Sequence, residues 1–397
     1  MPRKKVLFIS GSLGLGHIGR DLAIAGELRK RFDNLDIDWL AGPPADAVVR
    51  EAGENVLPEA RQLADENAVA EAASEGARLN LFRYLMDVRN GWSRNVEVVD
   101  RLTAHAGYDL VIGDETYDLA VAYKKEPERK HAPFVMIYDF IGADAVTWNP
   151  LERLGIYLLN RSWCQRVDPR PVDLSLFIGE PEDVPDRPFG PWLPNRRAWA
   201  QEFCDFVGYV LTFDPAQHAD RKAVRARLGY DGSPLVVCTV GGTAIGKDLL
   251  ELCGRAFPLA GDRIPGLRML LVSGPRVDPA RLDVPAGVDV RGYVPALHEH
   301  LAASDLAVVQ GGGTVTLELT ALRRPFLYFP LEDHYEQELH VAPRLERHRA
   351  GRRMAFSATT PETLARAIVE NIGAEVRYAS VPVDGARVAA EKISGLL

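Results

Sequence analysis

A histidine and an acid stand where open α/β sheets carry their reactive groups. His17 directly follows Gly16 in a glycine-rich turn at the expected start of a helix, and Asp114 directly follows the apolar run 110–113. A helix N-terminus disfavours the imidazolium ion, so we expect a neutral His17 that takes a proton from a hydroxyl or from water. Asp114, or the neighbouring Glu115, can orient such a base through its second ring nitrogen. The alternatives are a histidine that caps the helix or contacts a phosphate, and an acid that caps the next helix.

A second set of residues suited to ligand binding follows a strand near the other end of the chain. The apolar run 306–310 leads into Gly311-Gly312-Gly313-Thr314 and then into an expected helix. Glycines let the backbone approach a ligand closely, and the N-terminus of a helix suits a diphosphate. At 100° per residue, Glu318 falls about 40° from Thr314, where a carboxylate can accept hydrogen bonds from ribose hydroxyls. The alternative is a solvated surface acid.

Other strand ends in this half carry small or polar residues as well, which suits a nucleotide and a polyhydroxylated sugar. They are Gly241, Gly242 and Thr243 after 235–240, Tyr293 and Val294 after 288–291, and His334, Glu336 and Gln337 after 326–329. Four strand ends of this kind are more informative than any single turn. The pairs His298/His300 and His334/His340 lack the i, i+4 spacing of a helical zinc site, so we expect no bound metal.

The N-terminal turn also matches a dinucleotide-binding pattern, although incompletely. Gly14, Gly16 and Gly19 have the spacing G-x-G-x-x-G, but three residues separate the first of them from the strand, and no acid ends the second strand at 37–41. Both departures argue against a nicotinamide cofactor. Arg20, one turn into the helix, can bind an anion or pair with Asp21.

The elements that must position these residues alternate between strands and helices in both halves. Apolar runs at 6–10, 37–41, 110–113 and 134–138, and five more between 235 and 329, predict two parallel sheets with helices on both faces. We therefore predict an α/β protein of two Rossmann-like domains that face each other across a cleft. The N-terminal domain covers residues 1–207, a linker follows at 208–232, and the C-terminal domain covers 233–397. One option is that the last helix packs back on the N-terminal domain.

Composition narrows the class of protein. A net charge of −8 argues against a nucleic-acid binder. Four cysteines without CxxC spacing, the absence of a run of 18 apolar residues, and an N-terminus that is unlike a signal peptide predict a cytoplasmic protein without a transmembrane segment. The segment 151–164 is rich in Leu, Ile, Tyr and Trp, which is compatible with contact to a membrane surface or with a place in the core.

The run Gly14-Leu15-Gly16-His17-Ile18-Gly19-Arg20 resembles the N-terminal turn of GT-B glycosyltransferases, most closely the bacterial MurG-like branch. The segment from Gly311 to Gln337 resembles the donor-binding part of family 28 transferases. The resemblance covers both domains and is loose from 141 to 206. It departs from many relatives at Gln310, where they carry His or Ser.

The resemblance implies a nucleotide-diphosphate sugar of the UDP or dTDP type, bound by the C-terminal domain, and an acceptor bound by the N-terminal domain. It implies a base contact at Tyr293 and Val294, a diphosphate loop at 311–314, a ribose contact at Glu318 and a sugar contact at Glu336 and Gln337. His17 matches the general base of the family, which usually inverts the anomeric carbon without a metal.

We therefore expect an inverting, metal-independent glycosyltransferase without a cofactor and with an unknown acceptor. In this enzyme Asp114 orients His17, and Gly14, Gly16 and Arg20 belong to the N-terminal glycine loop. A nucleotide-sugar hydrolase of the same fold, a non-enzymatic nucleotide-sugar-binding protein and a nicotinamide oxidoreductase are the alternatives.

Overall fold

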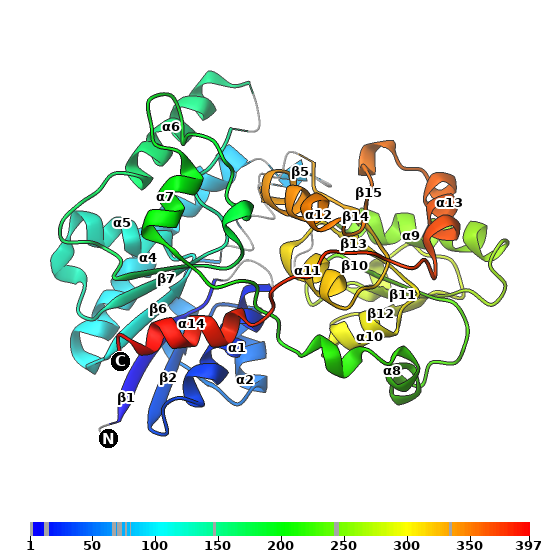
Figure 1. Ribbon diagram of the computed structural model, residues 1–397, viewed down its shortest axis with the longest axis horizontal. Coiled ribbons are helices and arrows are strands. Elements are labelled where there is room, and N and C mark those ends of the chain that lie inside the picture. Colours follow the sequence, from blue (N-terminus) through cyan, green and yellow to red (C-terminus); the bar gives the residue numbers. More distant parts are fainter. Residues whose placement is uncertain are drawn as a thin grey trace. The chain divides into compact units, whose positions relative to one another are not determined.

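The computed structural model describes residues 3–11, 16–65, 69, 74–75, 78–79, 81–145, 148–241, 246–332 and 336–397. These residues form two compact units (Figure 1). The first unit consists of Met1–Ala70, Leu81–Thr212 and Pro382–Leu397, and the second of Glu71–Asn80 and Phe213–Val381. Each unit has its own sheet.

The sheet of the first unit is parallel throughout and has the strand order β3-β2-β1-β6-β7-β8-β9. Its strands β1, β6 and β7 in the centre are almost entirely buried, as expected for a sheet that helices cover on both faces. The strands are β1 (Lys4–Ile9), β2 (Leu35–Leu40), β3 (Asn55–Val56), β6 (Leu110–Asp114), β7 (Phe134–Tyr138), β8 (Leu174–Phe177) and β9 (Asp205–Phe206).

Alternate residues of β1 belong to the hydrophobic cores on the two faces of the sheet, because successive side chains of a strand point to opposite faces. Val6 and Phe8 pack with α1, α2 and α14, whereas Leu7 and Ile9 pack in the core on the opposite face, to which α4, α5 and α7 contribute. The helices are α1 (Gly16–Arg29), α2 (Ala45–Glu51), α4 (Leu81–Ala106), α5 (Tyr117–Lys125), α6 (Pro150–Trp163), α7 (Arg196–Phe203) and α14 (Gly385–Ser394).

The sheet of the second unit is also parallel, with the order β12-β11-β10-β13-β14-β15. Helices α9 and α13 cover one face, and α8, α10, α11 and α12 contribute to the core on the other. The strands are β10 (Leu235–Thr239), β11 (Arg268–Val272), β12 (Asp289–Arg291), β13 (Leu306–Gln310), β14 (Phe326–Phe329) and β15 (Arg352–Arg353). The helices are α8 (Arg221–Leu228), α9 (Lys247–Gly261), α10 (Leu297–Ala303), α11 (Gly313–Ala321), α12 (Ala342–His348) and α13 (Pro361–Asn371).

Short elements complete the chain. An antiparallel pair joins β4 (Ser74–Glu75) to β5 (Arg78–Leu79), and a π-helical turn covers Gln337–Val341. The 3₁₀ turns are Pro58–Gln62, Pro127–Arg129, Pro181–Asp183, Pro215–His218, Pro279–Arg281 and Phe356–Ala358.

Two segments bear on the domain bounds that the sequence suggests, and only the second differs from them. The C-terminal helix α14 packs against α1 in the first unit, and Ala389, Ala390 and Ile393 are buried there (Figure 1). The segment 208–232, which we expected to be a linker, contains the whole of α8, and Val224 of this helix is buried in the second unit. Polar residues dominate α8, so a single buried valine gives little signal in the sequence.

Candidate functional site

The site in the first unit lies at the carboxyl ends of β1, β6 and β7. These parallel strands are neighbours, with Ile9 paired to Gly113 and Asp114 paired to Ile137. Their carboxyl ends therefore meet at one edge of the sheet. Helix α1, which follows β1, brings its first turn to the same edge.

His17 and Asp114 are in contact at this edge. The Nδ1 atom of His17 lies 2.8 Å from Oδ2 of Asp114, and the Asp114 side chain is completely buried. The orienting arrangement that the sequence suggests for these two residues is therefore present in the geometry. Asp114 can accept a proton from Nδ1, and in that tautomer the Nε2 lone pair is free to accept another proton.

Arg20 connects the groups of this site. Its Nε donates to Asp114 Oδ2 over 3.1 Å, its Nη2 donates to Asp114 Oδ1, and its Nη1 donates to Asp139 Oδ2 over 3.0 Å. Arg20 thus pairs with Asp114 and Asp139 rather than with Asp21, and its binding of a ligand anion stays a prediction. Asp21 instead accepts a hydrogen bond from the hydroxyl of Ser10.

The charges around His17 raise its pKa. Burial and the nearby Arg20 oppose the imidazolium ion, but the carboxylates of Asp114 and Asp139 outweigh them, so the pKa lies above the usual 6.5. The direction expected from the helix terminus alone is therefore wrong. Although burial disfavours the charge of Asp114, Arg20 and His17 lower its pKa, so this carboxylate is ionised.

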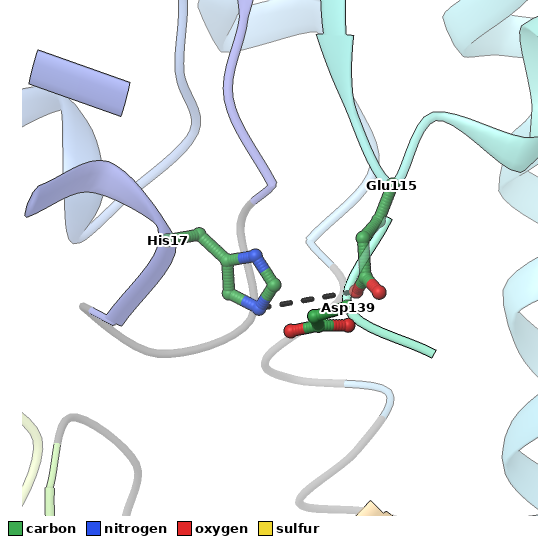
Figure 2. A group of neighbouring side chains, drawn as sticks. All are labelled: His17, Glu115 and Asp139. Carbon is green, nitrogen blue, oxygen red and sulfur yellow. Dashed lines mark ion pairs between the residues drawn. The ribbon is translucent and has the colours of Figure 1, made fainter. Parts of the chain in front are cut away.

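Asp139 and Glu115 complete the site. Figure 2 shows His17, Glu115 and Asp139 converging from α1 and from the ends of β6 and β7. Their ligand-type atoms lie within 4.8 Å of one another. Arg20 already balances the charge of Asp139, and burial together with Asp139 raises the pKa of Glu115 well above its usual range. Asp139 is thus paired with Arg20, whereas Glu115 is shifted toward its neutral form.

The sequence signal that identified Asp114 also applies to Asp139, which our sequence analysis missed. Asp114 is the last residue of β6, and Asp139 directly follows β7, which ends at Tyr138. In both cases the acid comes directly after the apolar run of a central strand. Applying the rule about strand ends to every strand would have found Asp139.

The second unit places its glycine turn between β13 and α11. Gly311 donates to Phe329 O over 2.9 Å, and a Cβ atom there would lie only 2.8 Å from Cα of Pro330. Gly313 begins α11, where the first backbone N–H groups have no partner within the helix. Arg344 donates to Gly313 O over 2.9 Å, which places a guanidinium beside this terminus.

Glu318 lies one turn into α11. Its side chain is half-buried and makes no hydrogen bond or ion pair with any residue that the structure describes, and burial raises its pKa to about 8. This environment differs from that of a solvated surface acid. A half-buried carboxyl group without a partner is suited to bind a hydroxyl of a ligand.

The remaining predicted residues of this unit differ in environment. Gly241 follows β10 with a φ of 86°, Thr314 is exposed, and Tyr293, which follows β12 with the half-buried Val294, is 44% exposed. Gln337 is buried, and its Oε1 accepts a hydrogen bond from the backbone of Leu331 over 2.8 Å, so this oxygen holds the loop. An ideal Cβ on Gly313 would be 3.6 Å from Oε1 of Glu336, so Glu336 lies near the start of α11.

Some predicted residues lie outside the described part of the chain. They are Gly14, Gly242, Thr243 and His334. Gly16 is described and is the first residue of α1. Gly312, which directly precedes α11, is half-buried.

The histidines that resemble metal ligands in the sequence have other partners. His298 stacks on Phe213 with ring centroids 4.1 Å apart. His300 is hydrogen-bonded through Nδ1 to the hydroxyl of Tyr230 over 2.7 Å. Both side chains therefore have partners within the protein.

Helix α6 exposes an apolar face. Leu151, Leu154 and Leu158 are 69%, 55% and 51% exposed, and Trp148 just before the helix is 85% exposed. The segment 151–164 thus contributes only part of its apolar residues to the core. Contact of this face with a membrane surface stays a prediction. Within the part of the chain that the structure describes, every helix is too short or too polar to cross a bilayer.

The chain matches known proteins in sequence. The model of the glycosyltransferase family 28 C-terminal domain matches residues 236–380. An uncharacterized glycosyltransferase of Methanosarcina mazei is 26% identical over 92% of this chain and 90% of its own length. Another, of Methanosarcina acetivorans, is 35% identical over 27% of this chain, and this match spans only 28% of that relative's length.

Solved structures share the fold. The glycosyltransferase of kitacinnamycin has a TM-score of 0.60 at 18% identity, with 100% of this chain and 94% of that chain covered. MurG of Acinetobacter baumannii has a TM-score of 0.50 at 14% identity, with 98% and 95% covered.

Proposed function

We propose that the chain, a glycosyltransferase of the GT-B fold whose residues 236–380 match the family 28 C-terminal domain, transfers a sugar from a nucleotide-diphosphate sugar to an acceptor hydroxyl. We further propose that the reaction inverts the anomeric carbon and needs no bound metal. The family match at 236–380 leaves the nicotinamide alternative without support. The hydrogen-bonded pair of His17 and Asp114 carries the mechanistic part of the proposal.

The proposed step moves one proton and exchanges one bond. Nε2 of His17 takes the proton of the acceptor hydroxyl while the hydroxyl oxygen bonds to the anomeric carbon. The bond between that carbon and the diphosphate oxygen breaks, and its electron pair leaves with the diphosphate. Attack from the face opposite the leaving group gives inversion. The ionised Asp114 stabilises the imidazolium ion that forms.

The donor site proposed for the second unit rests on the start of α11. The unsatisfied N–H groups of the first turn and the positive end of the helix dipole stabilise a diphosphate, both bound and leaving. Arg344 at Gly313 adds a positive charge on the same side. Glu318 is one turn away and without a partner among the described residues, which suits a ribose diol.

Transfer and hydrolysis are separated by an incubation with the donor alone. We expect a UDP- or dTDP-sugar to be consumed only slowly without an acceptor, and much faster when a hydroxyl acceptor from a panel is added. Chromatography of the nucleotide and the sugar measures both rates. Quantitative release of free sugar from the donor alone identifies a hydrolase, because water is then the acceptor. Donor binding without turnover by any member of the panel identifies a binding protein.

The raised pKa of His17 predicts the acid side of the pH profile. The base must be neutral, so we expect kcat/KM to fall as the pH drops through a midpoint above 6.5. Asp114→Asn removes a charge that raises this pKa, so the midpoint should move to lower pH. The plateau should fall as well, because the ring loses its orienting partner.

Nitrogen-15 NMR of the labelled histidines follows the same titration without a substrate. Asp100→Asn is the matched control, because it removes the carboxylate that pairs with the exposed His131 over 2.8 Å. That variant should leave the His17 midpoint in place. A midpoint that does not move in Asp114→Asn would show that the pair has no electrostatic role.

A further inference from the structure

Glu115 faces the ring nitrogen of His17 that is distant from Asp114. We propose that Glu115 is a positioning residue whose neutral carboxyl group, held beside Asp139, keeps the proton of His17 on Nδ1 and so leaves Nε2 free to act as the base. This inference rests on the proposed role of His17. It assigns to Glu115 a function different from that of Asp114, for which our sequence analysis considered it only as a substitute.

The contacts of Nδ1 do not by themselves fix the tautomer. Asp114 Oδ2 lies 2.8 Å from Nδ1 and can accept a proton from it. Nη2 of Arg20 lies 2.7 Å from the same atom and can donate to it. With the proton on Nδ1 the ring donates to Asp114, and with the proton on Nε2 the ring accepts from Arg20. Both tautomers therefore have a partner on this side, and the environment of Nε2 decides between them.

Glu115 is the group at Nε2. Its Oε2 lies 3.8 Å from Nε2, and a dashed line marks this contact in Figure 2. An ionised Glu115 would attract a proton to Nε2, and the base would then have no lone pair for the acceptor hydroxyl. A neutral Glu115 exerts no such attraction, so Asp114 draws the proton to Nδ1. The protonation of Glu115 thus selects the tautomer of His17.

The surroundings of Glu115 keep it neutral. Oδ1 of Asp139 is buried and receives no hydrogen bond from any N–H or hydroxyl group of the described residues. A carboxylate oxygen of Glu115 lies within 4.8 Å of one of Asp139, so a carboxyl proton of Glu115 is the donor that we infer for Asp139. Burial, then Asp139 and Asp114, raise the pKa of Glu115, and Arg20 opposes them without reversing the shift.

The backbone and one tyrosine hold Glu115 in this place. Glu115 has a φ of 53°, in the left-handed region that side chains other than glycine seldom adopt. Its backbone N–H donates to Ile137 O over 3.0 Å, and the hydroxyl of Tyr117 donates to its Oε1 over 3.1 Å. A strained backbone that aims a side chain at a base is a common feature of functional sites.

The inference is tested on the whole protein with nitrogen-15-labelled histidine and no substrate. Two-bond nitrogen–proton spectra distinguish the Nδ1–H from the Nε2–H tautomer, and His17→Gln identifies the signal of His17. In the wild type we expect the Nδ1–H tautomer once the ring is neutral, and a change to Nε2–H when Glu115 ionises as the pH is raised. Glu115→Gln carries no ionisable group, so it should keep the Nδ1–H tautomer throughout.

A second variant should move the change in the opposite direction. Asp139→Asn removes the charge and the acceptor that keep Glu115 protonated, so Nε2–H should appear at a pH lower by about one unit or more. Glu128→Gln, an exposed glutamate of the same unit, is the matched control and should behave as the wild type.

Two outcomes would overturn the inference. One is an Nε2–H tautomer in the wild type at neutral pH. The other is a change of the His17 tautomer in Glu115→Gln at the same pH as in the wild type, when circular dichroism shows that the variant is folded. Either result would leave the glycosyl transfer itself untouched, because the spectra contain no donor. Conversely, a missing transferase activity with the expected spectra would refute only the proposed function. In an active enzyme, the rate of Glu115→Gln should no longer decline at alkaline pH.

Discussion

His17→Ala is expected to lower kcat by about 10²- to 10⁴-fold, the range by which a positioned general base accelerates a reaction. The affinity for the nucleotide should change by less than about twofold, because the proposed donor residues belong to the other unit. Removal of the ring leaves the acceptor hydroxyl without a proton acceptor, while Asp114 and Arg20 still pair with each other. Steady-state kinetics and calorimetry with UDP or dTDP measure the two effects separately.

The control for this variant is His131→Ala. His131 also pairs with a carboxylate, that of Asp100, but it is exposed and lies outside the site. Its replacement should leave kcat unchanged. A His17→Ala protein that loses turnover and nucleotide affinity to the same extent would instead assign His17 to phosphate binding, which is the alternative that the sequence leaves open.

At a pH above about 8, where Glu318 is ionised, Glu318→Ala is expected to weaken the binding of UDP by about ten- to a hundredfold. The loss of a charge-assisted hydrogen bond costs about 1.5–3 kcal/mol, and each 1.4 kcal/mol is about a factor of ten in affinity. The loss should be smaller for dTDP, whose deoxyribose offers one hydroxyl fewer. Calorimetry on both nucleotides measures the difference. Glu375→Ala, an exposed glutamate of the same unit, should bind as the wild type does.

The pH dependence of UDP binding should follow the ionisation of the Glu318 carboxyl group. Its pKa is about 8 in the free protein, so it is mostly protonated at neutral pH. Ribose hydroxyls donate to the ionised form, which means that binding below this pKa releases a proton and affinity increases as the pH approaches about 8. Glu318→Gln should abolish the dependence. Unchanged affinity in Glu318→Ala would refute the ribose contact and the donor site built on it.

The fold was largely predictable because both sheets are parallel and buried. The central strands β1, β6, β7, β10 and β13 are short apolar runs, which the sequence displays directly. The strands β8 and β9, at one end of the first sheet, were not predicted, because their half-buried residues break the apolar pattern. The π-helical turn at Gln337–Val341 gives no signal of its own in the sequence.

The sequence by itself determined which residues stand at the strand ends and helix starts. His17, Asp114 and Glu318 were found in this way, since chain order and the geometry of parallel sheets place such residues at one edge. The tertiary structure decided how they pair and ionise. Arg20 bridges Asp114 and Asp139, residues 94 and 119 positions away along the chain, and burial raises the pKa of Glu318. Pairing across strands and loss of solvent depend on distances in space, and a linear sequence does not contain them.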